Sequence, residues 1–426
     1  MICQDLPILQ MMNKICGIIA EYNPLHNGHI YHIRETRRIG KVDFVVAIIS
    51  GNFMQRGVPA ILDKWTRGRL AVEAGSVDLV LEIPYFIATE SAEYYAKGSI
   101  GILESLGVID SVSFGSEKGS VEELKDIAKL LREEPFKYSD KLTEYIAEGM
   151  SFPKARERAV AEFLGDEYSK MLRLPNNILA VEYLKHIKSM QAITIKRQGG
   201  YHADDAGPEY PSATGIRKKI LDNKYDIVKN SVPREVYEEI TNNSISGLSK
   251  SMKEYFNLIR TEIVKRNSSE LENIQGITEG LENKIKKEIR YHDDYKEFVS
   301  SVKSKRYTMT AIERGLNHIL MSIDKKEVEE AFENEMWYTR VLALNDRGAF
   351  VLKKAKEKAG IKILNNINKE EKLPELFKYD IMASDIYNII TGKDMYKNSD
   401  FVMKPTTRSE ERRVGKECRS RWSPYH

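Results

Sequence analysis

The sequence predicts an α/β fold, in which a parallel sheet covered by helices on both faces is followed by a mainly helical C-terminal region. Short apolar runs alternate with segments of helical spacing over about the first 120 residues. These runs are continuously apolar, as strands are when both faces of a sheet are buried. Their alternation with helices indicates right-handed crossovers between parallel strands. Beyond about Pro233 the sequence changes to long amphipathic segments rich in Lys and Glu, which are typical of helices.

Five apolar runs are predicted to be strands, namely Lys14–Ala20, Val42–Ile49, Val77–Ile83, Asp110–Phe114 and Ala192–Lys196. The helices expected between them are His26–Ile39, Asp63–Ala74, Glu90–Leu106 and a mostly helical stretch from Val121 to about Met190. Asp63 has the side chain of a helix N-cap. Ligands of parallel sheets bind where the strands end. The loops at those ends are Glu21–Leu25, Ser50–Gly57, Pro84–Thr89 and Gly115–Gly119.

The chain divides into two main regions, with a predicted boundary between residues 228 and 229. Residues 12–228 hold the predicted sheet. Residues 229–407 are expected to be mainly helical, although Met336–Leu364 mixes strand-like and helical blocks. Met11 and Met12 precede the first strand, so residues 1–11 are interpreted as an over-extended start. Residues 408–426 have no apolar periodicity and resemble the translation of a sequencing adapter, so we expect them to be an artefact.

The composition is that of a soluble globular protein, with 30% charged and 42% hydrophobic residues. Of the 66 Lys/Arg and 63 Asp/Glu, residues 408–426 hold six and three, which leaves 60 of each. The net charge of +3 is therefore no sign of a nucleic-acid partner. No apolar run reaches the ~18 residues of a membrane span, so no membrane association is expected. Cys16 is the only cysteine outside the two suspect ends, which argues against disulfides and favours a reducing cytoplasm.

The stretch Glu21–His29 (EYNPLHNGH) places two histidines and a glycine where a predicted strand passes into a helix. His26 and His29 are three residues apart, so they lie on the same side of the first helical turn. Gly28 leaves room for a nucleotide to approach the backbone, and the helix N-terminus attracts phosphate. The stretch could hold a triphosphate and stabilise charge at its α-phosphate. The simpler alternative is a pair of surface or capping histidines; metal binding is less favoured, because no Cys, Asp or Glu cluster lies nearby.

A second phosphate-binding pattern follows the fifth predicted strand, at Ser212–Arg217 (SATGIR). The segment approximates the second signature of the HIGH-motif nucleotidyltransferases. That resemblance implies that the hydroxyls of Ser212 and Thr214 and the N–H groups of a helix start hold β- and γ-phosphates, with Arg217 as the counter-charge. Taken alone, the segment is explained as well by a serine-capped helix. Two such patterns in one chain favour a common ligand.

The strand, the EYNP turn and the helix that opens with HNGH resemble the HIGH-motif nucleotidyltransferases, and SATGIR approximates their second signature. More specifically, the chain resembles the tRNA(Met) cytidine acetate ligase family. The segments that carry this resemblance are Ile18–Tyr31, Ser50–Arg56 with Asp63–Trp65, Phe114–Glu117, Leu174–Asn177 and Ser212–Arg217. The resemblance runs from about Met12 to Arg217 and continues more loosely beyond. It implies a Rossmann-like nucleotidyltransferase domain for ATP and acetate over residues 12–228, and a mainly helical tRNA-binding region over residues 229–407.

The family resemblance implies an ATP-dependent ligase. Such an enzyme activates acetate as acetyl-adenylate and transfers the acetyl group to the exocyclic amine of the wobble cytidine of elongator tRNA(Met). His26 and His29 would be catalytic by positioning the reactants and neutralising charge, since acetate can itself attack the α-phosphate. The implied nucleotide-binding residues are Ile18, Ile19, Ala20, Glu21, Tyr22, Asn23, Pro24, Leu25, His26, Asn27, Gly28, His29, Ile30, Tyr31, Gly115, Asn176, Arg197, Ser212, Thr214 and Arg217.

Three of these residues have simpler explanations that the sequence leaves open. Gly115 could be a plain turn glycine, Asn176 the N-cap of a helix over Ile178–Ile187, and Arg197 a solvated residue at a strand end. Mg²⁺ is expected as the counter-ion of ATP, because a phosphate-bound ion needs few protein ligands. No metal site of the protein itself is predicted.

The loop after the second strand is a further candidate part of the site. Gln55, Arg56 and Lys64 could face acetate or phosphate. Alternatively, pairing between Asp63 and Arg67 could merely hold the loop in place, and the sequence does not decide between the two.

The best local basic segment is Lys303–Arg314 (KSKRYTMTAIER), with Lys284–Arg290 nearby. Lys and Arg on one face can bind phosphates, and Tyr307 could stack on an unpaired base. The common explanation of such a run is the solvated face of an amphipathic helix. With the family resemblance, the candidates for tRNA binding are Lys303, Lys305, Arg306 and Arg314. No obligate protein partner is evident from the sequence.

Two other functions are compatible with the same residues. One is a small-molecule adenylyltransferase of coenzyme biosynthesis; the long region after Asp222 counts against it, because such enzymes are usually single compact domains. The other is a non-catalytic RNA-binding protein that retains a nucleotide fold. Against this stands the joint presence of His26, Gly28, His29, Thr214 and Arg217, which a relic would have no reason to keep.

Overall fold

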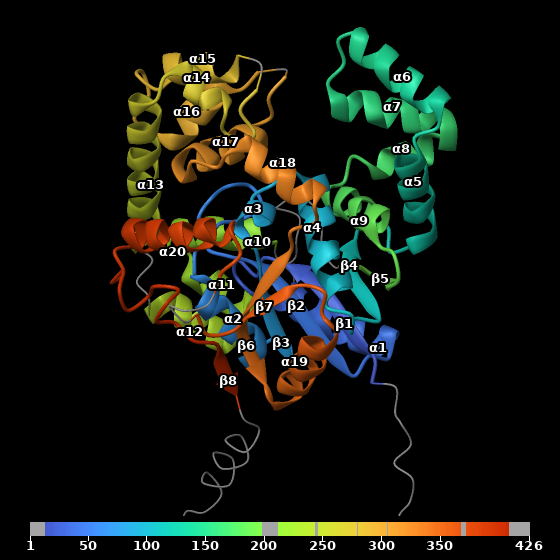
Figure 1. Cartoon of the computed structure of the whole chain (residues 1–426), viewed down its shortest axis with the longest axis vertical. Coiled ribbons are helices and arrows are strands. Elements are labelled where there is room, and N and C mark those ends of the chain that lie inside the picture. The colour runs from blue at the N-terminus through green and yellow to red at the C-terminus, as the bar shows by residue number, and fades with distance from the viewer. Residues whose placement is uncertain are drawn as a thin grey trace, which may run out of the picture.

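The computed structural model describes residues 13–197, 212–242, 246–278, 280–304, 306–367 and 372–408. Its centre is a single mixed, mainly parallel sheet with helices around it (Figure 1). The strands are β1 (Ile15–Ala20), β2 (Phe44–Ser50), β3 (Leu79–Ile83), β4 (Ser111–Ser116), β5 (Gln191–Lys196), β6 (Tyr338–Asn345), β7 (Lys362–Leu364) and β8 (Thr406–Arg408). All five predicted strands are thus present, as β1 to β5.

The helices fall into groups that follow the sheet connections. Those up to β5 are α1 (Asn27–Gly40), α2 (Lys64–Glu73), α3 (Tyr85–Ala88), α4 (Ala92–Ser105), α5 (Val121–Glu133), α6 (Phe136–Ala147), α7 (Phe152–Leu164), α8 (Asp166–Met171) and α9 (Pro175–His186). After β5 come α10 (Ala213–Leu221), α11 (Tyr225–Ser231), α12 (Arg234–Asn242), α13 (Ser246–Lys265), α14 (Ser268–Glu272), α15 (Leu281–Glu288), α16 (Tyr295–Val302), α17 (Met309–Met321), α18 (Lys325–Glu333), α19 (Asp346–Lys358) and α20 (Phe377–Thr391). No helix of the described part of the chain combines the length and apolar character that a membrane span requires.

The order of strands in the sheet is β5-β4-β1-β2-β3-β6-β7, and β8 pairs with β6. The chain builds outward from β1 to β2 and β3, then crosses back to add β4 and β5 on the other side of β1. The direction of growth therefore reverses between β1 and β4. In open α/β sheets, this switch point is where adjacent loops diverge and ligands bind.

Strand β2 shows why these segments form a sheet buried on both faces. Val45, Ala47 and Ile49 belong to one apolar cluster, together with residues of α1, α2 and α10. Val46 and Ile48 point to the opposite face and pack with residues of α4 and α5. Successive side chains of a strand point to opposite faces, so a continuously apolar run is what two covered faces demand. The sequence-based prediction of a covered parallel sheet is confirmed.

The sheet includes strands from both sides of residue 228. Strand β6 joins β3 in antiparallel orientation, and β7 and β8 both pair with β6. The strand-like and helical blocks that the sequence shows over Met336–Leu364 are β6, α19 and β7. Figure 1 shows α6 and α7 on one side, and α13 to α17 on the other, at the same end of the sheet. Arg408, the first residue of the suspect tail, ends β8, and residues 409–426 and 1–11 lie outside the described residues.

Candidate active site

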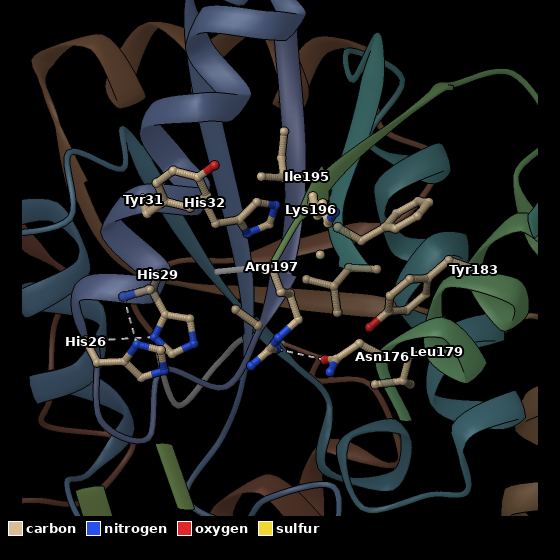
Figure 2. A pocket seen from close by; sticks show the side chains of 15 residues that line it. His26, His29, Tyr31, His32, Asn176, Leu179, Tyr183, Ile195, Lys196 and Arg197 are labelled. Atoms are coloured by element: carbon tan, nitrogen blue, oxygen red, sulfur yellow. Dashed lines mark hydrogen bonds between the residues drawn. The ribbon is translucent and has the colours of Figure 1, made fainter. Parts of the chain in front are cut away.

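A cavity of about 180 Å³ lies at the switch point, where β1, β4 and β5 end (Figure 2). Imidazole, guanidinium and amide groups line it together with apolar side chains. The lining residues are Ile19, Ala20, His26, Gly28, His29, Tyr31, His32, Phe114, Gly115, Asn176, Leu179, Tyr183, Ile195, Lys196 and Arg197. The cavity thus brings together predicted residues from four separate parts of the sequence.

His26 and His29 form the start of α1. The Nδ1 atom of His26 accepts a hydrogen bond from the Gly28 amide at 3.0 Å, and Nδ1 of His29 accepts one from the His26 amide at 3.3 Å. The two rings stack, with their centroids 3.7 Å apart. A Cβ atom at Gly28 would lie 2.8 Å from His26 Cε1, so only glycine lets this ring fold over the helix start. The histidines are therefore capping residues as well as lining residues of the cavity.

Both histidines are neutral in this structure. Burial, together with the guanidinium groups of Arg197 and Arg217, lowers the pKa of His26 to about 3. Burial and the neighbouring His26 hold the pKa of His29 well below its usual range. Because each Nδ1 atom accepts a backbone N–H, each neutral ring carries its proton on Nε2. In this state the two rings offer N–H donors, and the nearby positive charge belongs to arginines.

The second phosphate-binding pattern lies beside the first. Ser212 caps α10, with its hydroxyl oxygen accepting from the Gly215 amide at 3.1 Å. Arg217 donates from Nη1 to the carbonyl of Asn23 at 2.7 Å and from Nη2 to the hydroxyl of Thr214 at 3.0 Å. Asn23 belongs to the loop between β1 and α1, so the two patterns converge at one rim of the sheet.

On the opposite side of the cavity, polar side chains connect α9 to the residues that follow β4 and β5. Arg197 donates to Asn176 Oδ1 at 2.9 Å (Figure 2). Asn176 Nδ2 in turn donates to Glu117 Oε1 at 2.6 Å. Asn176 lies inside α9 and Leu174 is the N-cap, so the alternative of an Asn176 N-cap is wrong. A Cβ atom at Gly115 would meet the Arg197 side chain at 3.3 Å. The glycine therefore gives Arg197 its place across β4.

Several implied nucleotide-binding residues do not line the cavity. Ile18, Tyr22 and Leu25 are buried in the apolar cluster beneath it. The Glu21 carboxylate accepts from the Gln55 amide at 2.8 Å, so it ties two loops together. The remaining residues outside the lining are Asn23, Pro24, Asn27, Ile30, Ser212, Thr214 and Arg217.

Six lining residues were not predicted from the sequence: His32, Phe114, Leu179, Tyr183, Ile195 and Lys196. His32 had a visible signal, because it continues the three-residue spacing of His26 and His29 along one face of α1. Leu179 and Tyr183 follow Asn176 at helical spacing on α9. The others adjoin predicted residues at the ends of β4 and β5 and look like ordinary strand residues in the sequence.

At the loop after β2, the structure contradicts one residue of each alternative that the sequence left open. The Lys64 ammonium is buried and bonds Glu82 at 2.8 Å and Asp400 at 2.8 Å, so it does not face acetate or phosphate. Asp63 pairs with Lys393 rather than Arg67, and its carboxylate caps α2. The Arg67 guanidinium instead donates to main-chain carbonyls, namely those of Glu21, Ser50, Gly51 and Leu62. Gln55 joins Glu21 to the Glu90 carbonyl, and Arg56 is exposed.

The candidate tRNA-binding residues fall into two places. Lys303 and Arg306 are exposed at the turn between α16 and α17, and Lys305 lies outside the described residues. Arg314 is half-buried on α17 near Glu90. Burial raises the pKa of Glu90 to about 7, and the Arg314 guanidinium acts against this rise. A Cβ atom at Gly57 would lie 2.8 Å from Arg314 Cα. The loop after β2 therefore packs directly on the helix that carries Arg314.

No group of three or more His, Cys, Asp or Glu side chains suited to a metal ion occurs among the described residues.

The depressed histidine pKa values predict how stability depends on pH. The pKa of His26 is about 3 and that of His32 about 4, both lowered first by burial. Below the ordinary value of 6.5 the unfolded chain binds protons that the folded chain refuses, so stability falls as the pH drops from 6.5 toward 4. NMR titration of the imidazole C–H signals should find both rings neutral at pH 5. Midpoints near 6.5 would contradict the assigned burial.

Comparison with known proteins shows what the chain is related to. The model of the HIGH Nucleotidyl Transferase family matches residues 12–400. A tRNA(Met) cytidine acetate ligase of Thermoanaerobacter sp. (strain X514) is 41% identical over 91% of this chain and 98% of its own length. The enzyme of that name from Clostridium novyi (strain NT) is 39% identical over 92% of this chain and 99% of its own.

Two solved structures are similar to this chain over nearly its whole length. The crystal structure of Thermotoga maritima TmcAL bound with alpha-thio ATP has a TM-score of 0.84 to this chain at 30% identity, covering 93% of this chain and 100% of the other. Its apo form has a TM-score of 0.85 at the same identity and coverage. The match extends through the helical region after residue 228 as well as the sheet. On its sequence, its sheet and its paired phosphate-binding patterns, the chain belongs to the tRNA(Met) cytidine acetate ligase family of HIGH nucleotidyltransferases.

Proposed function

We propose that this chain is an ATP-dependent ligase that activates acetate as acetyl-adenylate. It then transfers the acetyl group to the exocyclic amine of the wobble cytidine of elongator tRNA(Met). The observation that carries the proposal is the hydrogen bond between Arg217 and the Asn23 carbonyl, which joins the SATGIR segment to the loop that precedes His26 and His29. Two phosphate-binding helix starts at one rim are what a bound triphosphate requires.

ATP would lie across the switch point. The phosphates would meet the N-termini of α1 and α10, where the Nε2–H groups of His26 and His29 and the Arg217 guanidinium converge. The nucleoside would occupy the cavity between Phe114, Tyr183 and the end of β5, where apolar walls suit a base. The relative from Thermotoga maritima was solved with alpha-thio ATP, which supports ATP as the ligand. Mg²⁺ would accompany the phosphates, held mainly by their oxygens.

In the first step, a carboxylate oxygen of acetate would attack the α-phosphorus of ATP. A new P–O bond forms, the bond to the bridging oxygen of the β-phosphate breaks, and diphosphate leaves. Acetate needs no activation by a protein nucleophile, so the protein's task is to align the two anions and stabilise the charge that develops. Neutral N–H donors suit this task, because they are already oriented by their bonds to the backbone of α1.

In the second step, the cytidine amine would attack the acetyl carbonyl carbon, AMP would leave and the amine would lose a proton. The tRNA must therefore reach the same rim of the sheet. Lys303 and Arg306, exposed beside α17, are proposed to hold its phosphates, and Arg314 stands between that region and the loop after β2. We place the reaction in the cytoplasm, where the buried Cys16 thiol remains unpaired.

One assay separates this function from its rivals. The full chain is incubated with labelled acetate and ATP, with and without tRNA(Met). Acetyl-AMP without tRNA and acetylated cytidine with it are the expected products. Transfer of AMP to another small acceptor would instead indicate an adenylyltransferase. Binding of tRNA without any consumption of ATP would indicate a non-catalytic RNA-binding protein.

A further inference from the structure

A third histidine of the cavity is anchored through two buried hydroxyl groups. His32 Nε2 lies 2.9 Å from the Ser113 hydroxyl oxygen, which lies 2.6 Å from the Thr36 hydroxyl oxygen. Ser113 is on β4 and Thr36 is one turn beyond His32 on α1; both are fully buried. Three side chains, two from α1 and one from β4, thus form one continuous hydrogen-bonded row that begins at the cavity.

The direction of these hydrogen bonds follows from counting protons. Ser113 is the only hydrogen-bonding partner of the Thr36 side chain within the described chain, so the Thr36 hydroxyl must donate to Ser113. Ser113 then has one remaining partner, and its own proton goes to His32 Nε2. The reverse order would leave the Thr36 proton buried without an acceptor, which costs about 1–3 kcal/mol. His32 therefore accepts at Nε2 and, when neutral, carries its proton on Nδ1.

The Nδ1–H group of His32 has no hydrogen-bonding partner among the described residues and retains accessible surface. Figure 2 shows the ring directed from α1 toward the cavity, near Ile195 and Lys196 of β5. Burial, and to a lesser extent the Arg197 guanidinium, lowers the pKa of His32 to about 4, so the ring is neutral at pH 7. His32 also lies three residues, about 4.5 Å along the helix axis, beyond His29. It is thus on the nucleoside side of the proposed phosphate site.

We propose that Thr36 and Ser113 are positioning residues that hold His32 in the Nδ1–H tautomer, so that it donates a hydrogen bond to the nucleoside of the bound nucleotide. This tautomer is opposite to that of His26 and His29, whose Nδ1 atoms accept from the backbone. One face of α1 therefore presents donors fixed in two different ways, by main-chain amides for the phosphates and by hydroxyls for the nucleoside. The proposal rests on the nucleotide-binding function proposed above.

The tautomer can be measured without any ligand. In the full chain labelled with ¹⁵N-histidine, long-range ¹H–¹⁵N NMR at pH 7 should show His32 protonated on Nδ1 and His26 and His29 on Nε2. Thr36→Val keeps the shape of the side chain but removes the first donor, and should convert His32 to a mixture of tautomers. Thr36→Ser restores the hydroxyl and should restore the Nδ1–H form. Protonation of His32 on Nε2 in the unaltered chain would overturn the proposal.

The role of Thr36 and Ser113 in nucleotide binding is measured by titration calorimetry with ATP. Ser113→Ala and Thr36→Val should each raise the Kd for ATP by about 3- to 10-fold, the range for loss of one neutral hydrogen bond. The matched control is Ser99→Ala, which removes a buried hydroxyl on α4 that has no hydrogen-bonding partner within the described chain; its Kd should stay unchanged. Equal Kd values for all the variants and the unaltered chain would reject the role of the hydroxyl pair.

Nucleotide analogues identify the atom that accepts the His32 Nδ1–H bond, and the unaltered chain distinguishes failure of this inference from failure of the proposed function. If the increase in Kd caused by the variants disappears with 2′- or 3′-deoxy-ATP, the acceptor is on the ribose. If the increase disappears with a deaza-ATP, the acceptor is a ring nitrogen of the base. A penalty that persists with every analogue rejects a direct bond to the nucleoside. If the unaltered chain binds no ATP at all, the proposed nucleotide function fails, and the role assigned to His32 Nδ1–H fails with it. The NMR result still decides the tautomer in that case.

Discussion

His29→Asn is expected to reduce acetate-dependent ATP–diphosphate exchange by about 10²- to 10³-fold, the usual cost of losing one preorganised donor to a developing negative charge. Asparagine can still accept the His26 amide through its side-chain oxygen, as His29 Nδ1 does at 3.3 Å. It cannot reach the position of Nε2–H. The substitution therefore removes the proposed catalytic donor while preserving the contact that closes the first turn of α1.

His29→Gln is the informative companion, because its amide nitrogen reaches about as far as Nε2. We expect it to retain at least a tenth of the exchange activity, provided that the ring contacts with His26 and Tyr22 are not needed for orientation. His292→Asn, at a histidine of the helical region that faces Glu288, should leave exchange unchanged. All three variants should bind tRNA as the unaltered chain does. Normal exchange by His29→Asn would remove His29 from the proposed mechanism.

The chemistry of the site could be predicted from sequence where it depends on neighbours in the chain. The segment Glu21–His29 contains its own strand end, turn and helix start, so its histidines had to lie at the carboxyl end of a strand. The convergence with Ser212–Arg217 followed only from the family resemblance, because no local rule brings α10 to the loop after β1. That proximity is now visible as the bond from Arg217 to Asn23.

The protonation of the histidines was not predictable in the same way. A sequence shows that His26 and His29 share a face, but not that burial and two guanidinium groups keep them neutral. The sequence also did not show that the region after residue 228 adds strands to the sheet. Tyr338–Asn345 is apolar enough for a strand, yet its antiparallel pairing with β3 is a long-range choice made by packing. Lys64 was misplaced for the same reason, since its partner Asp400 comes from a distant C-terminal segment.

Asp400→Ala is expected to lower the free energy of unfolding by about 3–5 kcal/mol, the cost of removing one partner from a buried ion cluster. The Asp400 carboxylate accepts from Lys64 Nζ at 2.8 Å and from Arg340 Nη1 at 2.6 Å, and the Ser384 hydroxyl donates to its other oxygen at 2.7 Å. Lys64, Arg340 and Asp400 are each at most 1% exposed. Without Asp400, Glu82 would be left as the single ionised acid facing two buried cations.

No other acid in this cluster can take over the charge. Asp380 is close by, but burial and the negative charge of Glu82 raise its pKa to about 8. Its two carboxyl oxygens already accept from the Tyr338 hydroxyl and the Tyr85 amide, so Asp380 is committed to other partners. Water cannot easily compensate either, because the Arg340 guanidinium is stacked over the Trp65 ring with its carbon 4.6 Å from the ring centre.

Urea unfolding of the full chain would measure this effect. Asp400→Asn retains the shape and the bond from Ser384 but not the charge. Its free energy of unfolding should therefore lie between those of the unaltered chain and Asp400→Ala. Asp140→Ala, which removes an exposed carboxylate on α6 with no ion pair among the described residues, should change stability by less than about 0.5 kcal/mol. If Asp400→Ala were no more destabilising than Asp140→Ala, the buried cations would have to be compensated from elsewhere. Asp400 also supports the loop after β2, because Lys64, which it holds through the ammonium group, donates its amide to the Asn52 side chain of that loop at 2.8 Å.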